Sequence, residues 1–268
     1  MRVSSAERTL NYVLLALFTL FALTPIASIL RSALSARIGD SGAFHPENVA
    51  EAWRIGGFQQ ALWHSTVVAV IVVAASLVLS VLAGYALGTM RFRGNRFMTQ
   101  LFLLGLMIPA EAIVIALFFD FRSLSLTDTY AAIALPQIAQ SVAFGTFWMR
   151  AQFRALPDSL LEASALDGAG SWRTLTRILV PASRPAITTL LVLLFMWTWN
   201  EFLIALVMAP SGTRRTAPLG LANFQGQYTA ENALLASGAI IVALPVVVVF
   251  LFLQRHFIRG MLEGVTKG

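Results

Sequence analysis

Long apolar runs bounded by charged residues dominate the chain. Six of them are each about as long as a helix that crosses a bilayer, which needs about 20 residues. None alternates with the period of two expected of a barrel strand, and lipid offers backbone groups no hydrogen-bond partners, so helices are expected. The pattern predicts an all-α polytopic membrane protein with six transmembrane helices, at 10–30, 66–87, 98–119, 130–149, 186–208 and 234–253.

The composition supports a membrane location. The chain is 57% hydrophobic and 12% charged, whereas soluble domains are roughly a quarter charged. The first apolar run is too long for a typical signal peptide and is interpreted as a retained span. No linker or repeat divides the 268 residues, so a single transmembrane domain is expected. Its external loops would be 31–63 and 209–233, with an internal loop at 150–185 and a tail at 254–268.

The placement of basic residues predicts the orientation. The loops and termini on one side carry thirteen of the nineteen Lys and Arg residues, against six on the other side. Basic residues accumulate on the cytoplasmic side of membrane proteins, so both termini are expected in the cytoplasm. This topology explains the net charge of +6 better than nucleic-acid binding does. The thirteen are Arg2, Arg8, Arg91, Arg93, Arg96, Arg150, Arg154, Arg173, Arg177, Arg184, Arg255, Arg259 and Lys267; the six are Arg31, Arg37, Arg54, Arg122, Arg214 and Arg215.

The internal loop reads ALPDSLLEASALDGAGSWRTLTRILVPASRP over 155–185. Pro157 suits the first turn of a helix, the DGAG stretch interrupts it, and Ser171 is a candidate N-cap for a second helix. Apolar residues recur at helical spacing in both halves, and Pro181 and Pro185 end the second. The loop therefore predicts two short helices around a glycine break. The spaced apolar residues are Leu160, Leu161, Ala165, Trp172, Leu175, Ile178 and Leu179.

Such a pair can simply lie on lipid headgroups, but its residue order resembles the EAA loop of ATP-binding cassette importer permeases. That pattern is an EAA triplet, a DGA group and a later I-x-x-P. Ser164 replaces the third motif residue, usually alanine, and Val180 stands where leucine is common; both keep a small or apolar residue. The matching residues are Glu162, Ala163, Asp167, Gly168, Ala169, Ile178 and Pro181, followed by Pro185.

The resemblance implies that this loop is the coupling helix that docks on the ATP-hydrolysing subunit. A rigid helix transmits motion, small residues permit close approach, and Gly168 supplies backbone freedom. A glycine needed only for local folding is the alternative for Gly168. The expected coupling residues are Glu162, Ala163, Ser164, Asp167, Gly168 and Ala169.

Further stretches resemble the carbohydrate branch of these permeases, especially the smaller, six-span subunit of the maltose-type pair. The resemblance implies a second permease chain, an ATPase dimer that binds ATP and Mg, an extracytoplasmic sugar-binding protein and a location in the bacterial inner membrane. It implies no cofactor on this chain. The stretches are MRFRGNR, MIPAEAIVI, SLTDTYAAIALP, WTWNEFLIAL and QRHFIRGMLEGVTKG.

Polar residues inside the predicted spans are candidates for the translocation path. Glu111 and Glu201 are acids where a carboxylate is costly and faces a cavity or a partner. At the helical rise, Glu201 would lie roughly 22 Å along an unbroken fifth span, near the outer face. Tryptophan near it is either a sugar platform or an interfacial anchor. The candidate path residues are Pro109, which would kink the third span, with Glu111, Trp199, Asn200 and Glu201; Trp197 is nearby.

The external loop 209–233 resembles the family segment that contacts the binding protein, with Gly220, Asn223 and Gln225 as candidate contacts. An ordinary polar connection is the alternative. The polar tail 254–268 corresponds to a family segment that reaches the ATPase.

An enzyme is a poor alternative. The chain has no cysteine and three histidines, and it lacks H-E-x-x-H, G-x-S-x-G and P-loop motifs. An ion-driven secondary transporter would show inverted repeats and charged midplane sites. The substrate stays open: a sugar is favoured, with a polyol or a glycerol phosphate ester as the alternative.

Overall fold

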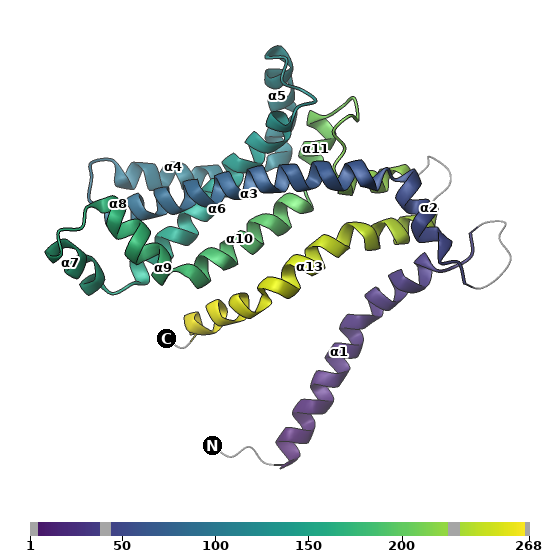
Figure 1. The fold of residues 1–268 in the computed structure, drawn as a ribbon, viewed down its shortest axis with the longest axis horizontal. Helices are drawn as coiled ribbons and strands as arrows, with labels where there is room; N and C mark the ends of the chain where they lie inside the picture. The colour runs from purple at the N-terminus through teal and green to yellow at the C-terminus, as the bar shows by residue number, and fades with distance from the viewer. Residues whose placement is uncertain (1–4, 38–43, 225–230, 266–268) are drawn as a thin grey trace. The chain divides into compact units, whose positions relative to one another are not determined.

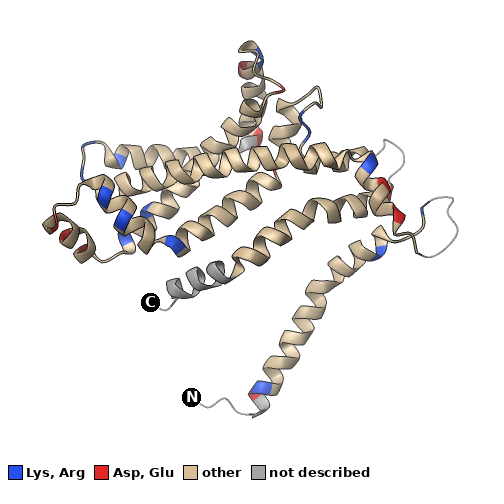
Figure 2. Cartoon of the chain, in the orientation of Figure 1, with Lys and Arg blue, Asp and Glu red and all other residues tan. Residues whose placement is uncertain are grey.

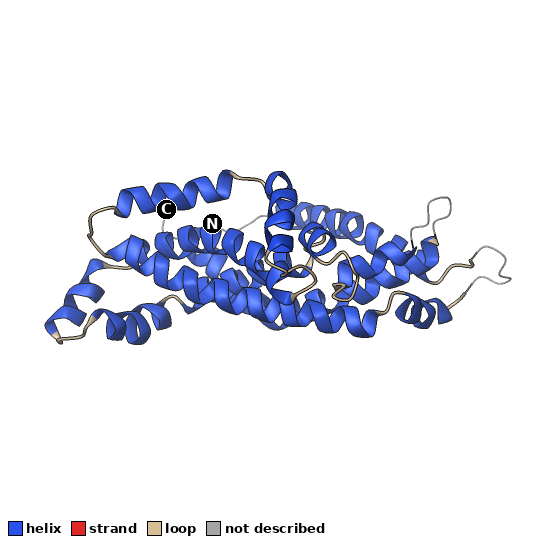
Figure 3. Ribbon diagram, turned by 90° about the horizontal axis from the view of Figure 1, so that it is seen from above, coloured by secondary structure: helices blue, strands red, loops and turns tan. Residues whose placement is uncertain are grey.

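The computed structural model describes residues 5–37, 44–224 and 231–265, and every regular element in these ranges is helical (Figure 1, Figure 3). The chain divides into two compact units. Unit 1 is Met1–Gln59 with Gly220–Leu244, and unit 2 is Gln60–Leu219 with Pro245–Gly268. That a single domain spans both units stays a prediction.

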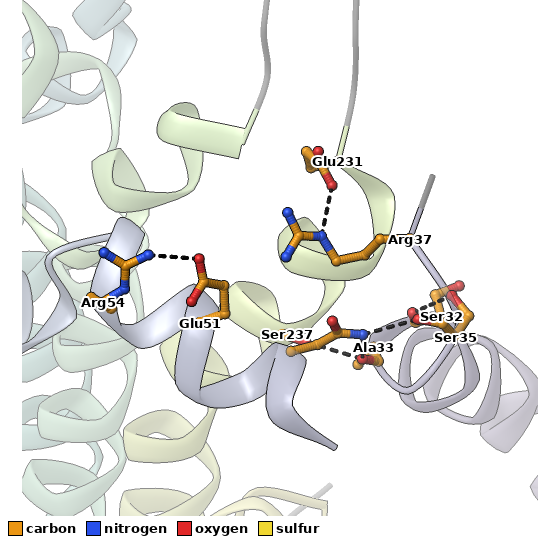
Figure 4. Close-up of polar contacts among 9 residues, drawn as sticks. Ser32, Ala33, Ser35, Arg37, Glu51, Arg54, Glu231 and Ser237 are labelled. Atoms are coloured by element: carbon orange, nitrogen blue, oxygen red, sulfur yellow. Dashed lines mark hydrogen bonds and ion pairs between the residues drawn. The ribbon is translucent and has the colours of Figure 1, made fainter. Parts of the chain in front are cut away.

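Unit 1 is held together by polar contacts at the end of helix α1 (Ser5–Ala33), which the close-up in Figure 4 shows. Asn48 of α2 (Glu47–Ile55) is buried and donates to the carbonyls of Ala33 (3.0 Å) and Ser35 (2.9 Å). Ser237 of α13 (Asn232–Val265) donates to the same Ala33 carbonyl. These bonds satisfy carbonyls that a helix end leaves without intrahelical partners.

Two phenylalanine rings and two glycines form the packed centre of unit 1. Phe58 begins α3 (Phe58–Thr89), is fully buried and lies 6.3 Å from the ring of Phe224 in η2 (Leu221–Phe224). A Cβ atom at Gly220, the last residue of α12 (Ala217–Gly220), would lie 2.9 Å from the Phe58 ring. A Cβ atom at Gly238 would lie equally close to Phe224. Both glycines are therefore required for close packing.

Unit 2 contains the rest of α3 with α4 (Asn95–Met107), α5 (Ala110–Ser123), α6 (Tyr130–Ala155), α10 (Arg184–Trp199) and α11 (Leu203–Met208). One apolar cluster joins α3, α6 and α11 around Val72, Ile133 and Met208. A second joins α6 to the following helices around Met149 and Leu190. Helices α3 and α6 belong to both clusters, so their contact is central to the unit.

Small residues let α3 and α6 touch. Ser76, Ser80 and Gly84 recur every four residues on α3 and all are buried. A Cβ atom at Gly84 would lie 2.6 Å from the Cβ atom of Met149, and one at Gly145 would lie 2.7 Å from the Cβ atom of Ser80. Spacing by four places the small residues on one helix face, an arrangement that membrane helices use for close contact.

The predicted spans agree with the structure in part. In the part of the chain that the structure describes, three helices are long and apolar enough to cross a membrane: Glu7–Ala33, Phe58–Thr89 and Asn232–Gln254. Two bent helix pairs raise that number to as many as five. The continuous helix predicted at 186–208 is wrong, because α10 ends at Trp199. The helix predicted at 98–119, with a kink at Pro109, is divided there into α4 and α5. A span count of six stays a prediction.

Candidate functional site

The predicted third span is broken at Pro109. Ile108 is extended (φ −83°, ψ 114°), as the proline ring requires of the residue before it. Pro109 itself precedes α5 in an extended conformation, and its carbonyl accepts from the N–H of Ala112. Helices α4 and α5 meet at 98°. The predicted kink is thus a full change of direction, because the chain leaves helical geometry at two successive residues.

The predicted fifth span is broken at Asn200 and Glu201. The Asn200 amide donates to the Met196 carbonyl (2.7 Å), which closes the end of α10. Glu201 Oε1 accepts from the backbone N–H of Ile204 (2.7 Å) and so caps the start of α11. Placing Glu201 by the rise of an unbroken helix was wrong, since the helix ends before it.

The two breaks open onto one cavity of about 560 Å³ in unit 2, between α4, α5, α6 and α10. This volume is within the range of small-molecule sites. Non-helical backbone at membrane depth is tolerated where it lines a cavity, which is the arrangement seen here. Its polar lining residues are Glu111, Gln137, Gln140, Ser141, Thr198, Asn200 and Glu201, with the indole of Trp197.

Two of the predicted path residues are not among those that line this cavity. Trp199 is 3% exposed and packs beside Phe195, with ring centroids 5.4 Å apart. Pro109 shapes the break without lining the cavity. Trp197 takes the place of Trp199, since it is 49% exposed and stands edge-on to Phe144 at 4.7 Å. Two positions along a helix differ by about 200°, so neighbouring tryptophans on α10 face opposite ways.

Sequence reasoning missed the polar residues of α6. Gln137, Gln140 and Ser141 lie within the fourth apolar run, where their spacing of three and four places them on one helix face. This polar face of α6 could have been recognised from the spacing of the three residues in the sequence. Amides, hydroxyls and carboxylates beside an exposed indole suit a ligand with many hydroxyl groups, because they offer donors and acceptors next to an apolar face.

The glycine break of the internal loop is a Schellman motif. Helix α7 (Asp158–Leu166) ends when Gly168 adopts φ +67°. Its N–H donates to the Ala165 carbonyl (3.1 Å), and the N–H of Ala169 donates to the Ser164 carbonyl (2.9 Å). Both bonds are those of the motif, which favours glycine at the left-handed position. A Cβ atom at Gly168 would meet nothing within 4 Å.

The second half of the loop differs from the prediction in its helix type, its N-cap, the exposure of Trp172 and the place of its prolines, since Pro181 lies inside a short helix at Val180–Ala182 and Pro185 lies inside α10. It forms α8 (Ser171–Thr174), a π-helical turn η1 (Leu175–Leu179) and α9 (Val180–Ala182). The N-cap is Gly170, and Ser171 is the first helical residue. Trp172 is 68% exposed, so it does not share the buried face of Leu175 and Leu179.

A buried hydrogen bond joins the two halves. Ser164 is 3% exposed, and its hydroxyl lies 2.8 Å from that of Thr174. The serine that departs from the EAA pattern is thus accommodated by a partner across the break. Its neighbours Glu162, Ala163, Asp167 and Gly168 are exposed, and Ala169 is half-buried. Leu166 is 90% exposed beside them, so the outer face of α7 combines acids, small residues and an apolar side chain.

The external loop is fixed at its start. Ser211 donates from both its N–H and its hydroxyl to Asp128, and the Arg214 guanidinium lies 4.3 Å from the centre of the Tyr130 ring. Tyr130 in turn makes a hydrogen bond of 2.6 Å to His64.

The three binding-protein candidates have different environments. Gly220 is buried against Phe58, so its lack of a side chain serves internal packing. Asn223 is exposed and donates to the Ile55 carbonyl (3.2 Å). Gln225 lies outside the described residues. Among the described residues, no group of three His, Asp or Glu side chains is arranged to hold a metal ion.

Apolar helices, a polar cavity between broken helices and an exposed helix pair outside the bundle define a membrane transport permease. Residues 79–263 match the family described as the binding-protein-dependent transport system inner membrane component, and the chain belongs to that family. It is a multi-pass transport subunit, not an enzyme.

Relatives match most of the chain or nearly all of it. The maltodextrin transport system permease protein MdxG of Bacillus subtilis is 30% identical over 277 residues, which cover 99% of each chain. The trehalose transport system permease protein SugB of Mycobacterium tuberculosis is 32% identical and covers 79% of this chain and 78% of its own. A solved bacterial transporter that imports the acidic polysaccharide alginate shares the fold, with a TM-score of 0.77, 22% identity and coverage of 96% and 99%.

Proposed function

We propose that this chain is a permease subunit of an ATP-driven importer and that its cargo is a sugar. Membership of a binding-protein-dependent transport family carries the proposal. The names of several relatives specify oligosaccharides or disaccharides, among them maltodextrin and trehalose. Nothing in these relatives favours a polyol, a glycerol phosphate ester or an ion-driven mechanism.

The importer requires partners. An ATPase and an extracytoplasmic binding protein belong to the family's mechanism. We further propose a second permease chain that completes the path, with ATP and Mg bound by the ATPase. The thirteen basic residues of one side support cytoplasmic termini. In that orientation α7 faces the ATPase and the loop that contains Asn223 faces the binding protein.

The coupling surface we propose is the outer face of α7. Glu162 and Asp167 offer carboxylates to basic groups of the ATPase, and Leu166 offers an apolar contact at the tip. The Ser164–Thr174 bond and the Schellman bonds tie α7 to the segment that leads into α10. A push on α7 is therefore passed as a rigid-body motion to α10, which lines the cavity.

The energy source is tested in membrane vesicles that contain the assembled transporter. We expect uptake to persist when a protonophore dissipates ion gradients, and to stop when the ATPase subunit carries an inactivating substitution. Uptake that follows the ion gradient would instead indicate a secondary transporter.

The cargo class is tested by thermal unfolding of the cognate binding protein with sugars, polyols and glycerol phosphates, since a ligand that binds the folded state raises the stability of the binding protein.

The proposed path is tested with a single thiol, because the chain has no cysteine of its own. In Gln140→Cys the thiol lies in the 560 Å³ cavity. We expect a cationic methanethiosulfonate to modify it about tenfold faster than an anionic one, the ratio that about 1.4 kcal/mol of electrostatic preference produces. The cause is the pair of carboxylates, Glu111 and Glu201. Mass spectrometry of the chain measures both rates.

The matched control is the same thiol in a chain with Glu111→Gln, where the preference should fall. A cargo sugar should slow modification by either reagent. Equal rates for both reagents in the unaltered cavity would contradict its acidic character, and a thiol that resists both would remove the cavity from the aqueous path.

A further inference from the structure

A second cavity in unit 2 has the opposite electrostatic character. It is a groove of about 1150 Å³ where the α3–α4 connection, the end of α6 and the start of α7 meet. Figure 2 shows basic residues gathered at this end of the unit. Asp158 is the one acid among the described residues that line the groove. The groove contains five arginines, which are Arg91, Arg93, Arg96, Arg150 and Arg154.

Hydrogen bonds to helix ends give the groove a defined shape. The Asn95 amide donates to the carbonyls of Leu87 (3.2 Å) and Met90 (3.1 Å), which holds the α3–α4 connection against the end of α3. From α6, Nε of Arg150 donates to the Leu87 carbonyl and Nε of Arg154 to that of Gly88. Two guanidinium groups are therefore anchored by one nitrogen each, and their other nitrogens remain available to a ligand.

The charge of the groove is not balanced within the described residues. None of the five arginines forms an ion pair with a described carboxylate. Burial, and then repulsion by Arg154, lower the pKa of Arg150 below its usual value. Both causes would be offset by an anion beside the guanidinium. The positive-inside rule explains the side of the membrane on which these residues lie, but not their convergence on one groove.

We propose that this arginine groove binds the phosphodiester headgroup of an anionic phospholipid. Arginine matches phosphate oxygens in geometry and charge. The apolar side chains of Leu87, Phe92, Phe153 and Leu161 share the wall and suit the glycerol backbone and upper acyl chain. The groove lies where membrane helices end, and in the proposed orientation it faces the leaflet whose anionic lipids attract basic pockets.

The lipid would act on the coupling loop. Asp158 and Leu161 line the groove and belong to the first turns of α7, whose outer face carries Glu162. A bound lipid thus holds the start of α7 from the membrane side through the apolar side chain of Leu161, while the ATPase contacts its other face; the carboxylate of Asp158 has the same sign as the headgroup and contributes no attraction. This consequence rests on the proposed function, whereas lipid binding itself is measured without transport.

The test compares two pairs of substitutions in the assembled transporter. Arg93→Gln with Arg96→Gln removes two charges from the groove, and neither arginine is needed for the anchoring bonds. Arg173→Gln with Arg177→Gln removes two exposed charges from the internal loop 150–185, which is predicted on the same side of the membrane but lies outside the groove. Native mass spectrometry with phosphatidylglycerol and phosphatidylcholine measures retained lipid. We expect phosphatidylglycerol binding to weaken about thirtyfold in the groove pair, from about 1 kcal/mol for each of the two basic residues at a membrane surface, and little in the control pair.

Each other outcome overturns the proposal. Equal loss in both pairs would show a diffuse charge effect, and equal retention of the two lipids would show no headgroup recognition. Displacement of phosphatidylglycerol by millimolar inorganic phosphate would assign the groove to a soluble phosphate. Phosphatidylglycerol binding seen only after the ATPase is removed would assign the groove to the interface between this chain and the ATPase.

Discussion

Gly168→Asp is expected to abolish ATP-coupled uptake while the protein still inserts and assembles. Gly168 has φ +67°, and a side chain there would meet nothing within the chain. A left-handed conformation costs an ordinary residue about 1–2 kcal/mol, which is too little to unfold the whole protein. The larger effect is expected from the partner, because the new carboxylate projects from the surface that docks on the ATPase. Uptake and ATPase activity in proteoliposomes measure it.

Two variants separate docking from local folding. Gly170→Asp adds the same side chain two positions away, at an ordinary φ of −69° and in open space, and should retain most uptake. Gly168→Asn adds a side chain of similar size that tolerates the left-handed region. Loss of uptake in Gly168→Asn would support a docking surface that has no room for a side chain at position 168. Restored uptake in that variant would assign the defect of Gly168→Asp to its negative charge, because Asp and Asn tolerate the left-handed region alike. Wild-type uptake by Gly168→Asp would refute the docking role.

The hydrophobic runs predicted the helices that lack internal breaks. Helices α1, α3 and α13 follow from length and composition, because lipid demands backbone bonds within the segment. The runs at 98–119 and 186–208 failed because hydropathy does not report backbone direction. Pro109 indicates a disturbed helix from the sequence alone. Nothing in Asn200 or Glu201 alone predicts that their side chains bond to the backbone and divide the helix.

The candidate sites were predictable to different degrees. In the internal loop, the break at Gly168 follows from the glycine-containing sequence itself. The bond from Ser164 to Thr174, the N-cap at Gly170 and the exposure of Trp172 depend on how the two halves of the loop pack. The cavity lining depends on which face of each helix turns inward. Glu111 and Glu201 were identifiable as costly charges, but the choice between Trp197 and Trp199 depends on helix rotation, which neighbouring helices determine.

The contact between α3 and α6 is the feature of unit 2 that tolerates least change. Gly84→Ala is expected to destabilise the protein by about 2–3 kcal/mol, the upper range for overpacking. A Cβ atom at Gly84 would lie 2.6 Å from Met149 Cβ and 2.9 Å from the backbone nitrogen of Arg150, so a helix must move. Movement of α6 also disturbs Gln137, Gln140 and the two guanidinium anchors. Thermal unfolding and size-exclusion profiles of the purified complex measure the loss.

Gly105→Ala on α4 is the matched control. Its Cβ atom would make an ordinary contact of 3.8 Å with Ala143 of α6, and alanine favours the helix by up to about 1 kcal/mol over glycine. Stability should therefore stay unchanged or rise in this variant. A similar fall in both variants would mean that the two glycines serve α3 and α4 through helix flexibility. An unaffected Gly84→Ala would mean that α3 and α6 separate at little cost. The stripe of Ser76, Ser80 and Gly84 argues against both, because small residues at this spacing are what a close and fixed helix contact requires.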